Sequence, residues 1–317
     1  MFSAVKRDNS RKFHDPDVTA TGEARAVVPF SALKTLWFNT GTLCNLACHN
    51  CYIESTPRND RLVYLSRGEV QAFLREARGG ATELEEIGFT GGEPFMNPDI
   101  VGMIEDSLRA GLRVLVLTNA MKPMQQKAEA LLSLHQEFPA RLTIRVSLDH
   151  FDCGGHEKLR GLGSWTPTID GLKWLAQGGF DVAIASRNVA NAPEAALRAG
   201  YERLFKALAL PVDAMNPCQL VIFPEMDART NVPEITEACW GILGKRPDQT
   251  MCATSRMVVK RKGWAKAAVV SCTLLPYHPE FELGATLAEA ARPIKLNHPH
   301  CAKFCVLGGA SCSPHPG

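Results

Sequence analysis

Six short apolar runs restrict the folds open to this chain more than any other feature of its sequence. They span residues 33–40, 84–90, 112–118, 141–149, 180–186 and 218–224. Helical patterns lie between them: Ser66 and Glu69 stand at capping-box spacing in residues 66–79, and residues 98–110 and 194–209 repeat apolar residues at helical intervals. Strands that are each followed by a helix or a long loop predict a parallel sheet with helices outside it.

The alternation within the strands distinguishes two parallel architectures. In residues 141–149 the even positions, Leu142 to Leu148, are apolar, and the odd positions, Thr143 to Asp149, are polar. An open doubly wound sheet buries both faces and is apolar on both. One polar face instead favours a partial (β/α)6 TIM-like barrel, an α/β fold whose lumen is open to a ligand.

The regular alternation is confined to the middle of the chain. We expect a polar N-terminal extension over residues 1–32, the partial barrel over 33–229 and a small C-terminal domain over 230–317. In the last region "WAKAAVVSC" is compatible with a strand, whereas "PYHPEF" and residues 297–317 look like loops. Too few apolar residues remain there for burial alone to drive compact folding, so we expect a metal group to hold this cysteine-rich domain together.

Chemically distinctive residues follow five of the predicted strands. They are the cysteine triplet "CNLACHNCY" (44–52), "TGGEP" (90–94), "TNA" (118–120), "SLD" (147–149) and "SRN" (186–188). In α/β barrels the reactive residues come from the carboxyl ends of the strands and the loops after them. We therefore expect these strand ends to surround one site.

The triplet places Cys44, Cys48 and Cys51 on one loop. Three thiolates can hold zinc or an iron–sulfur cluster. Structural zinc takes four ligands and usually draws them in two pairs, whereas three cysteines alone suit a cubane whose fourth iron is left open. The spacing favours the cluster and leaves zinc as the alternative.

C-x3-C-x2-C after the first strand, Gly-Gly-Glu-Pro after the second and the six-strand rhythm together resemble the radical SAM enzymes over residues 33–225. The resemblance implies a 4Fe–4S cluster on Cys44, Cys48 and Cys51, with S-adenosylmethionine (SAM) on the open iron through its amino and carboxylate groups. It also implies an enzyme in which reductive cleavage of SAM releases a 5′-deoxyadenosyl radical that abstracts a substrate hydrogen. Reduced ferredoxin or flavodoxin would donate the electron.

The resemblance assigns the second motif to SAM binding. Gly91 and Gly92 permit close backbone approach, and Glu93 offers a carboxylate to the cationic amino group. The alternative for this motif is a plain turn that ends a strand. Many members of the family have an aromatic residue just before the third cysteine, but here Asn50 stands there and the aromatic follows at Tyr52. We expect this difference to change the packing around the adenine and not the cluster.

Polar residues at the later strand ends complete the implied SAM site. By resemblance, Asn119, Ser147 and Asp149 would reach the ribose or the methionyl group, although turn or cap residues of these types are also common. Arg160 would bind the SAM carboxylate or only close the loop, and Arg187 is the alternative residue for binding this carboxylate. No residue is identified as a catalytic base or hydrogen donor.

Five cysteines in the final third resemble the SPASM and twitch extensions, which carry auxiliary 4Fe–4S clusters. They are Cys252, Cys272, Cys301, Cys305 and Cys312. SPASM domains with two clusters use more cysteines at tighter spacings, so five predict one twitch-like cluster with a thiol to spare. We expect Cys252 and Cys272 to combine with two of the other three. The alternative is zinc, with His298 and His300 as further ligands.

Composition excludes several classes of partner. The 35 basic and 33 acidic side chains give a net charge of +2, which indicates neither a nucleic-acid nor a membrane partner. No signal-peptide core or membrane span is apparent, which predicts a cytoplasmic protein. In that reducing compartment eleven cysteines indicate metal binding or catalysis rather than disulfides. Cys153, Cys218 and Cys239 are interpreted as small buried apolar residues.

The resemblance leaves the substrate open. Auxiliary extensions belong mostly to enzymes that modify peptides or proteins, which is the first choice, and small-molecule biosynthesis is the alternative. Some thirty residues before the first strand are too few for a winged-helix leader-binding module, so leader recognition would need a separate protein or the barrel itself. A non-enzymatic iron–sulfur or zinc protein is the third possibility, but it would need no SAM pocket.

Overall fold

A nine-stranded sheet lies at the centre of the computed structural model, which describes residues 12–80, 83–189, 191–225, 227 and 230–308. The strands are β2 (Thr35–Asn39), β3 (Glu86–Thr90), β4 (Arg113–Thr118), β5 (Leu142–Ser147), β6 (Asp181–Asn188), β7 (Leu220–Pro224), β8 (Ser255–Val259), β9 (Ala268–Val270) and β10 (Glu282–Gly284). Their spatial order is β10-β9-β8-β2-β3-β4-β5-β6-β7.

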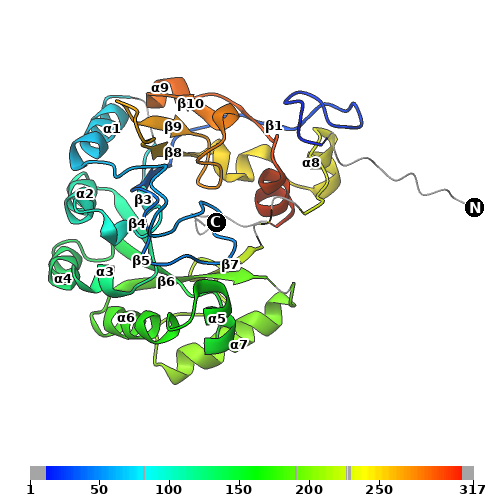
Figure 1. The fold of residues 1–317 in the computed structure, drawn as a ribbon. Helices are drawn as coiled ribbons and strands as arrows, with labels where there is room; N and C mark the ends of the chain where they lie inside the picture. Colours follow the sequence, from blue (N-terminus) through cyan, green and yellow to red (C-terminus); the bar gives the residue numbers. More distant parts are fainter. Residues whose placement is uncertain (1–11, 81–82, 190, 226, 228–229, 309–317) are drawn as a thin grey trace, which may run out of the picture.

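Strands β2 to β7 form the predicted partial barrel. They follow one another in chain order and every neighbouring pair is parallel. Each coincides with one of the six predicted runs, with ends that differ by no more than two residues. Figure 1 shows the sheet curving around a central space, with helices along its outer side. The α/β fold and the barrel-like curvature are therefore confirmed.

The outer helices are those that the sequence pattern predicts, with additions. They are α1 (Arg67–Gly79), α2 (Ile100–Arg109), α3 (Lys122–Gln125), α4 (Ala128–Glu137), α5 (Cys153–Arg160), α6 (Trp165–Gln177) and α7 (Glu194–Ala207). The capping box at α1 is present: Ser66 N donates to Glu69 Oε2 at 3.0 Å, and Glu69 N donates to Ser66 Oγ at 3.3 Å. Within the described ranges no helix has the length and apolar character needed to cross a membrane.

The C-terminal third continues the barrel sheet. Strand β8 pairs with β2 in parallel, β9 pairs with β8 and β10 with β9, both antiparallel. Around these strands lie α8 (Ala238–Leu243), α9 (Leu287–Ala290) and a π-helical turn, η6 (Cys301–Leu307). The expectation of a loop was wrong for η6, because Phe304 and Val306 are buried there and anchor the turn in the core. The predicted boundary at residue 229 stays a prediction.

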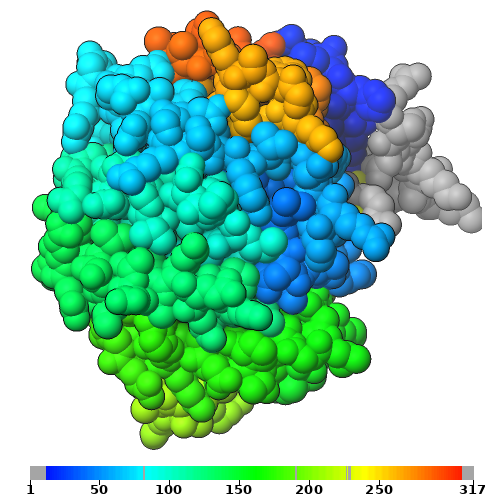
Figure 2. Space-filling model, turned by 60° about the vertical axis from the view of Figure 1, so that its left-hand side comes forward, coloured from blue at the N-terminus to red at the C-terminus, as the bar shows by residue number. Residues whose placement is uncertain are grey.

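The segment after the cysteine triplet packs beneath the C-terminal third. Tyr277 Oη donates to the carbonyl of Ile53 at 2.8 Å, and Val63 N donates to the carbonyl of Lys260 at 2.8 Å. Figure 2 shows this segment in blue, at the surface between the orange C-terminal strands and the green helices. The cysteine loop is thus fastened to the C-terminal third, the other part of the chain that was predicted to carry a metal group.

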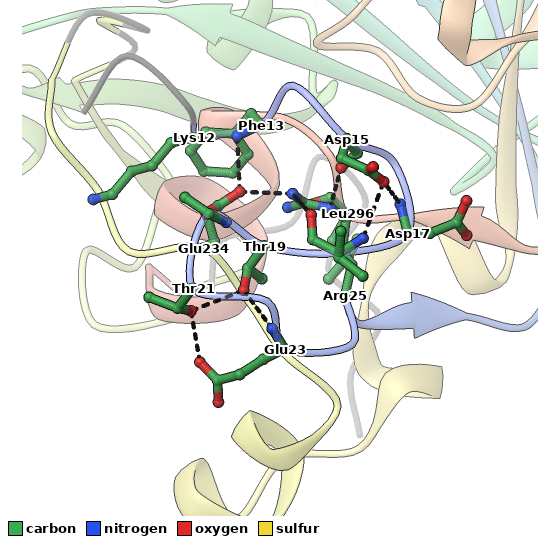
Figure 3. A network of polar contacts seen from close by, with 12 residues as sticks. Lys12, Phe13, Asp15, Asp17, Thr19, Thr21, Glu23, Arg25, Glu234 and Leu296 are labelled. Carbon is green, nitrogen blue, oxygen red and sulfur yellow. Dashed lines mark hydrogen bonds and ion pairs between the residues drawn. The ribbon is translucent and has the colours of Figure 1, made fainter. Parts of the chain in front are cut away.

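A buried ion pair fastens the N-terminal segment to the C-terminal third. Arg25 Nη2 lies 2.6 Å from Glu234 Oε1, and the same carboxylate accepts from Phe13 N and Ala20 N at 2.7 Å each (Figure 3). Burial raises the pKa of Glu234, but these hydrogen bonds and Arg25 outweigh it and hold the pKa below its usual value. Next to this pair, β1 (Val27–Val28) joins β11 (Ile294–Lys295) in an antiparallel ribbon.

We predict that Gly88→Ala destabilises the barrel. Gly88 lies beside Trp37 across the β2–β3 pair, and a Cβ there would stand 2.3 Å from the indole, which is fully buried. Overpacking of this kind costs roughly 1–3 kcal/mol of the free energy of unfolding, measurable by urea denaturation. Gly68→Ala in α1 is the control, because its Cβ would meet nothing within 4 Å. Equal stability of the two variants would contradict the packing argument.

Candidate active site

One cavity lies at the carboxyl ends of the parallel strands. Its walls include Gly91 and Gly92 after β3, Leu117 and Asn119 on β4 and just after it, Asp149 after β5, Arg160 on α5, Arg187 on β6 and Phe223 on β7. The structure therefore brings together six of the eight residues that the resemblance assigns to SAM. Glu93 and Ser147 are not among the residues that line this cavity.

The three thiols of the triplet line the same cavity. Burial raises the pKa of Cys44 to about 12, against a weak opposing hydrogen bond from Leu46 N, and burial also raises the pKa of Cys48. Binding a metal group as thiolates would therefore release protons. Within the described part of the chain, no three His, Cys, Asp or Glu side chains converge on a single-ion site. A cubane is a different case, because its thiolates bind separate irons.

The two glycines of "TGGEP" bring the end of β3 against the backbone that leads to Cys44. Gly92 N donates to the carbonyl of Gly41 at 2.8 Å, and a Cβ on Gly92 would lie 2.2 Å from the carbonyl oxygen of Leu43. Gly91 has a φ of 141°, and a Cβ there would lie 2.5 Å from the carbonyl oxygen of Gly41. Glycine is required at both positions for this contact.

Glu93 is 2% exposed and connects two strand ends. Its Oε1 accepts from Thr118 Oγ1 at 2.8 Å and from Phe95 N at 3.2 Å, and its Oε2 accepts from Asn119 N at 2.9 Å. Asn119 Nδ2 in turn donates to Asn45 Oδ1 at 2.8 Å, within the cysteine loop. Burial raises the pKa of Glu93 to about 7, although these hydrogen bonds oppose the shift. In this arrangement Glu93 positions Asn119, which lines the cavity.

Asp149, 2% exposed, binds two arginines at the cavity wall. Its Oδ2 lies 2.8 Å from Arg160 Nε and 2.7 Å from Arg187 Nη2, and Arg187 Nη1 donates to the carbonyl of His49 at 2.8 Å. Burial alone would raise the pKa of Asp149, but the two guanidinium groups hold it below its usual value. Two cations for one carboxylate leave a surplus of positive charge beside Cys48.

The backbone explains the unusual residue in the triplet. Asn50 has a φ of 51°, in the left-handed region where Asn is far better tolerated than a bulky aromatic residue. Its side chain donates to Glu225 Oε1 at 3.0 Å, and both Asn50 and Tyr52 line the cavity. The aromatic side chain at the cavity is therefore that of Tyr52, two positions later, where φ is not positive.

A second cavity in the C-terminal third gathers four of the five predicted cysteines. They are Cys252, Cys272, Cys301 and Cys305. The remaining walls are mainly apolar, and burial raises the thiol pKa values of Cys252 and Cys301. Cys312 lies outside the described residues. His300 also lines this cavity, whereas His298 does not.

A third cavity, lined by both polar and apolar side chains, adjoins both of the others. Cys48 and Cys51 line it together with the barrel cavity, and His300 lines it together with the C-terminal cavity. Tyr277 and His278 also line it, and Leu274 borders all three cavities. We call this space the vestibule.

Some site residues have only a weak signal in the sequence. Asn45 could have been proposed from its place beside Cys44, and Phe223 from its place at the end of a predicted strand. Phe304, whose ring centroid lies 5.2 Å from that of Phe223, closes the barrel cavity from a segment that looked like a loop. Cys153 is exposed at the start of α5, so its interpretation as a buried residue was wrong.

Comparison with known proteins shows what the chain is similar to. A family model described as "Radical SAM superfamily" matches residues 38–190. The antilisterial bacteriocin subtilosin biosynthesis protein AlbA of Bacillus subtilis is 27% identical over 169 residues, which are 53% of this chain and 35% of AlbA. The chain therefore spans only about a third of the length of this curated relative.

Two solved structures share the fold. Streptococcus suis SuiB bound to precursor peptide SuiA superimposes with a TM-score of 0.59 at 14% identity, covering 80% of this chain and 63% of SuiB. Native anSMEcpe with bound AdoMet and Kp18Cys peptide has a TM-score of 0.56 at 14% identity, covering 81% of this chain and 79% of that one. At these identities the likeness concerns the fold alone.

We predict that Gly92→Ala removes the iron held by the triplet. The new Cβ must displace the Leu43 carbonyl, and the Cys44 thiol moves with it. After anaerobic reconstitution with iron and sulfide, the variant should lack the iron of one cluster. Gly154→Ala in α5 is the matched control, since its Cβ would make an ordinary contact at 3.6 Å. Equal iron in both variants would disprove the role of this contact.

The raised pKa of Glu93 predicts a pH-dependent stability. Between its ordinary value of 4.5 and about 7, folded Glu93 keeps a proton that the unfolded chain has lost. The free energy of unfolding therefore falls as pH rises, by up to about 1.4 kcal/mol per unit. Glu93→Gln does not titrate, so the stability lead of the native metal-free protein over this variant should shrink between pH 5 and pH 8 in urea denaturation. A constant lead would show that Glu93 is ionised throughout.

Proposed function

Because residues 38–190 of this chain belong to the radical SAM superfamily, we propose that the protein reductively cleaves SAM and uses the 5′-deoxyadenosyl radical to abstract a substrate hydrogen. The observation that carries this proposal is the meeting of Cys44, Cys48 and Cys51 with the ends of the parallel strands in one cavity. Bound there, a 4Fe–4S cluster with an open iron would supply the electron for cleavage.

The chain's own residues would bind and orient SAM. Arg160 and Arg187 share one buried carboxylate, that of Asp149, so one positive charge is left that the SAM carboxylate would balance. Asn119 lines the cavity and is held in place by Glu93. In this assignment Glu93 acts through Asn119, and Asp149 acts by positioning the two arginines.

The same reasoning extends to an auxiliary cluster. Four thiols in one apolar cavity match the ligand number of a 4Fe–4S cluster. The ligands would be Cys252, Cys272, Cys301 and Cys305. The short π-helix η6 supports this assignment, since it carries Cys301 and Cys305 on consecutive turns and such helices occur frequently at functional sites.

The substrate class that we favour is a peptide or protein. AlbA acts in the biosynthesis of a bacteriocin, and two proteins of the same fold bind peptides in their solved structures. The vestibule is open beside the barrel cavity, and its lining includes polar side chains, among them Tyr277 and His278, that can hydrogen-bond to a peptide backbone. The electron would come from reduced ferredoxin or flavodoxin.

The first test measures SAM cleavage. Protein reconstituted anaerobically with iron and sulfide, and reduced with dithionite, should convert SAM to 5′-deoxyadenosine. A variant with Cys44, Cys48 and Cys51 replaced by Ala should produce none, yet keep the iron of the auxiliary cluster. Cys153→Ala is the control, because this exposed thiol lies in neither cavity. No cleavage by the fully reconstituted protein, or full cleavage by the triple variant, would overturn the proposal.

The second test concerns the auxiliary cluster. Cys252→Ala and Cys301→Ala should each remove iron from the triple variant, in which no other cluster remains. Cys239→Ala is the matched control, because this half-buried thiol accepts a hydrogen bond from Thr236 N and lies outside the C-terminal cavity. Iron content that is unchanged by Cys252→Ala would place the auxiliary cluster elsewhere or exclude it.

A further inference from the structure

Arg256 on β8 carries a buried positive charge beside the cysteine-lined cavity of the C-terminal third. Arg256 is 1% exposed. Four backbone carbonyls accept from its guanidinium, those of Cys252 at 2.6 Å, Ser255 at 2.7 Å, Ala290 at 2.9 Å and Arg292 at 2.9 Å. The ring of Phe30 covers one side, with its centroid 4.3 Å from Cζ. The group is therefore fixed in position and shielded from solvent.

No carboxylate neutralises this charge within the described part of the chain. Burial lowers the pKa of Arg256, and the negative charges that would oppose this shift are those of Cys252 and Cys272 as thiolates. Arg25 and Arg160 are buried as well, but each has a carboxylate partner, Glu234 and Asp149. A buried cation without a counter-charge is costly, and carbonyl dipoles offset only part of that cost. The protein as folded therefore lacks an anion at this place.

We propose that Arg256 is the counter-cation of the auxiliary cluster, an inference that rests on the proposed function. A cubane with four thiolate ligands is a net anion, and reduction adds one more negative charge. The guanidinium would stabilise both states and the reduced state more strongly, so it raises the reduction potential of the cluster. Through the carbonyl of Cys252 it also positions the backbone of one ligand.

The experiment separates charge from shape. In the background where Cys44, Cys48 and Cys51 are Ala, any iron present belongs to the auxiliary cluster, whose potential is followed by dye-mediated titration with EPR detection. Arg256→Met removes the charge and should lower the reduced-to-oxidised ratio at a fixed potential at least tenfold, which is a shift of about 59 mV for one electron. Arg256→Lys keeps the charge and should shift the potential less.

Arg198→Met is the matched control. This arginine on α7 also donates to a backbone carbonyl, that of Ala214 at 2.6 Å, but it does not line the cysteine cavity. The variant should lose stability, measured by urea denaturation, without any change in the potential or in the iron content. It therefore reports what the loss of a carbonyl-binding arginine does by itself.

The outcomes are distinct. A cluster that keeps its native potential in Arg256→Met overturns the inference and leaves the auxiliary cluster standing. Loss of iron in both Arg256→Met and Arg256→Lys, with iron retained in Arg198→Met, also overturns it, because the role would then be structural. Loss in Arg256→Met alone supports a requirement for the charge. No iron in the background protein before Arg256 is changed refutes the auxiliary cluster and this inference together.

Discussion

The burial of positive charge beside thiols is the constraint on which the rest of this structure depends. In the barrel, Arg160 and Arg187 share the single carboxylate of Asp149, and in the C-terminal third the guanidinium of Arg256 donates to four backbone carbonyls. Such arrangements are costly in an empty protein and favourable once an anionic group is bound. We therefore expect folding stability and cofactor loading to be thermodynamically linked in this chain.

Backbone contacts in the barrel fix the positions of the residues around the first cavity. The parallel strands end on one side of the sheet, and the close approach of Gly92 to Leu43 ties the second strand end to the cysteine loop. Glu93 and Asn119 extend the connection to the third strand end. Hydrogen bonds thus connect the second and third strand ends to the cysteine loop at Asn45.

Much of this arrangement was predictable because it is local. The six barrel strands are apolar runs of five to eight residues, and all six were confirmed. Strands β8 to β10 were missed or only suggested, since they are short and their place is decided by pairing with β2, over two hundred residues away in the chain. The sequence identified Glu93 but could not show that its carboxylate is buried and accepts hydrogen bonds from Thr118 Oγ1 and Asn119 N. Arg256 has no local signal, because only the tertiary fold places it among cysteines.

The pairing of β8 with β2 also limits how the molecule can move. Two domains joined by a linker can rotate apart to admit a ligand, but here the C-terminal third is hydrogen-bonded into the barrel sheet and fastened again by the Tyr277 contact to the cysteine loop. Hinge opening between the two cysteine-lined cavities would break that sheet. A ligand would therefore reach either cavity without rotation of the C-terminal third, and the vestibule, which shares lining residues with both, lies between them in the described part of the chain.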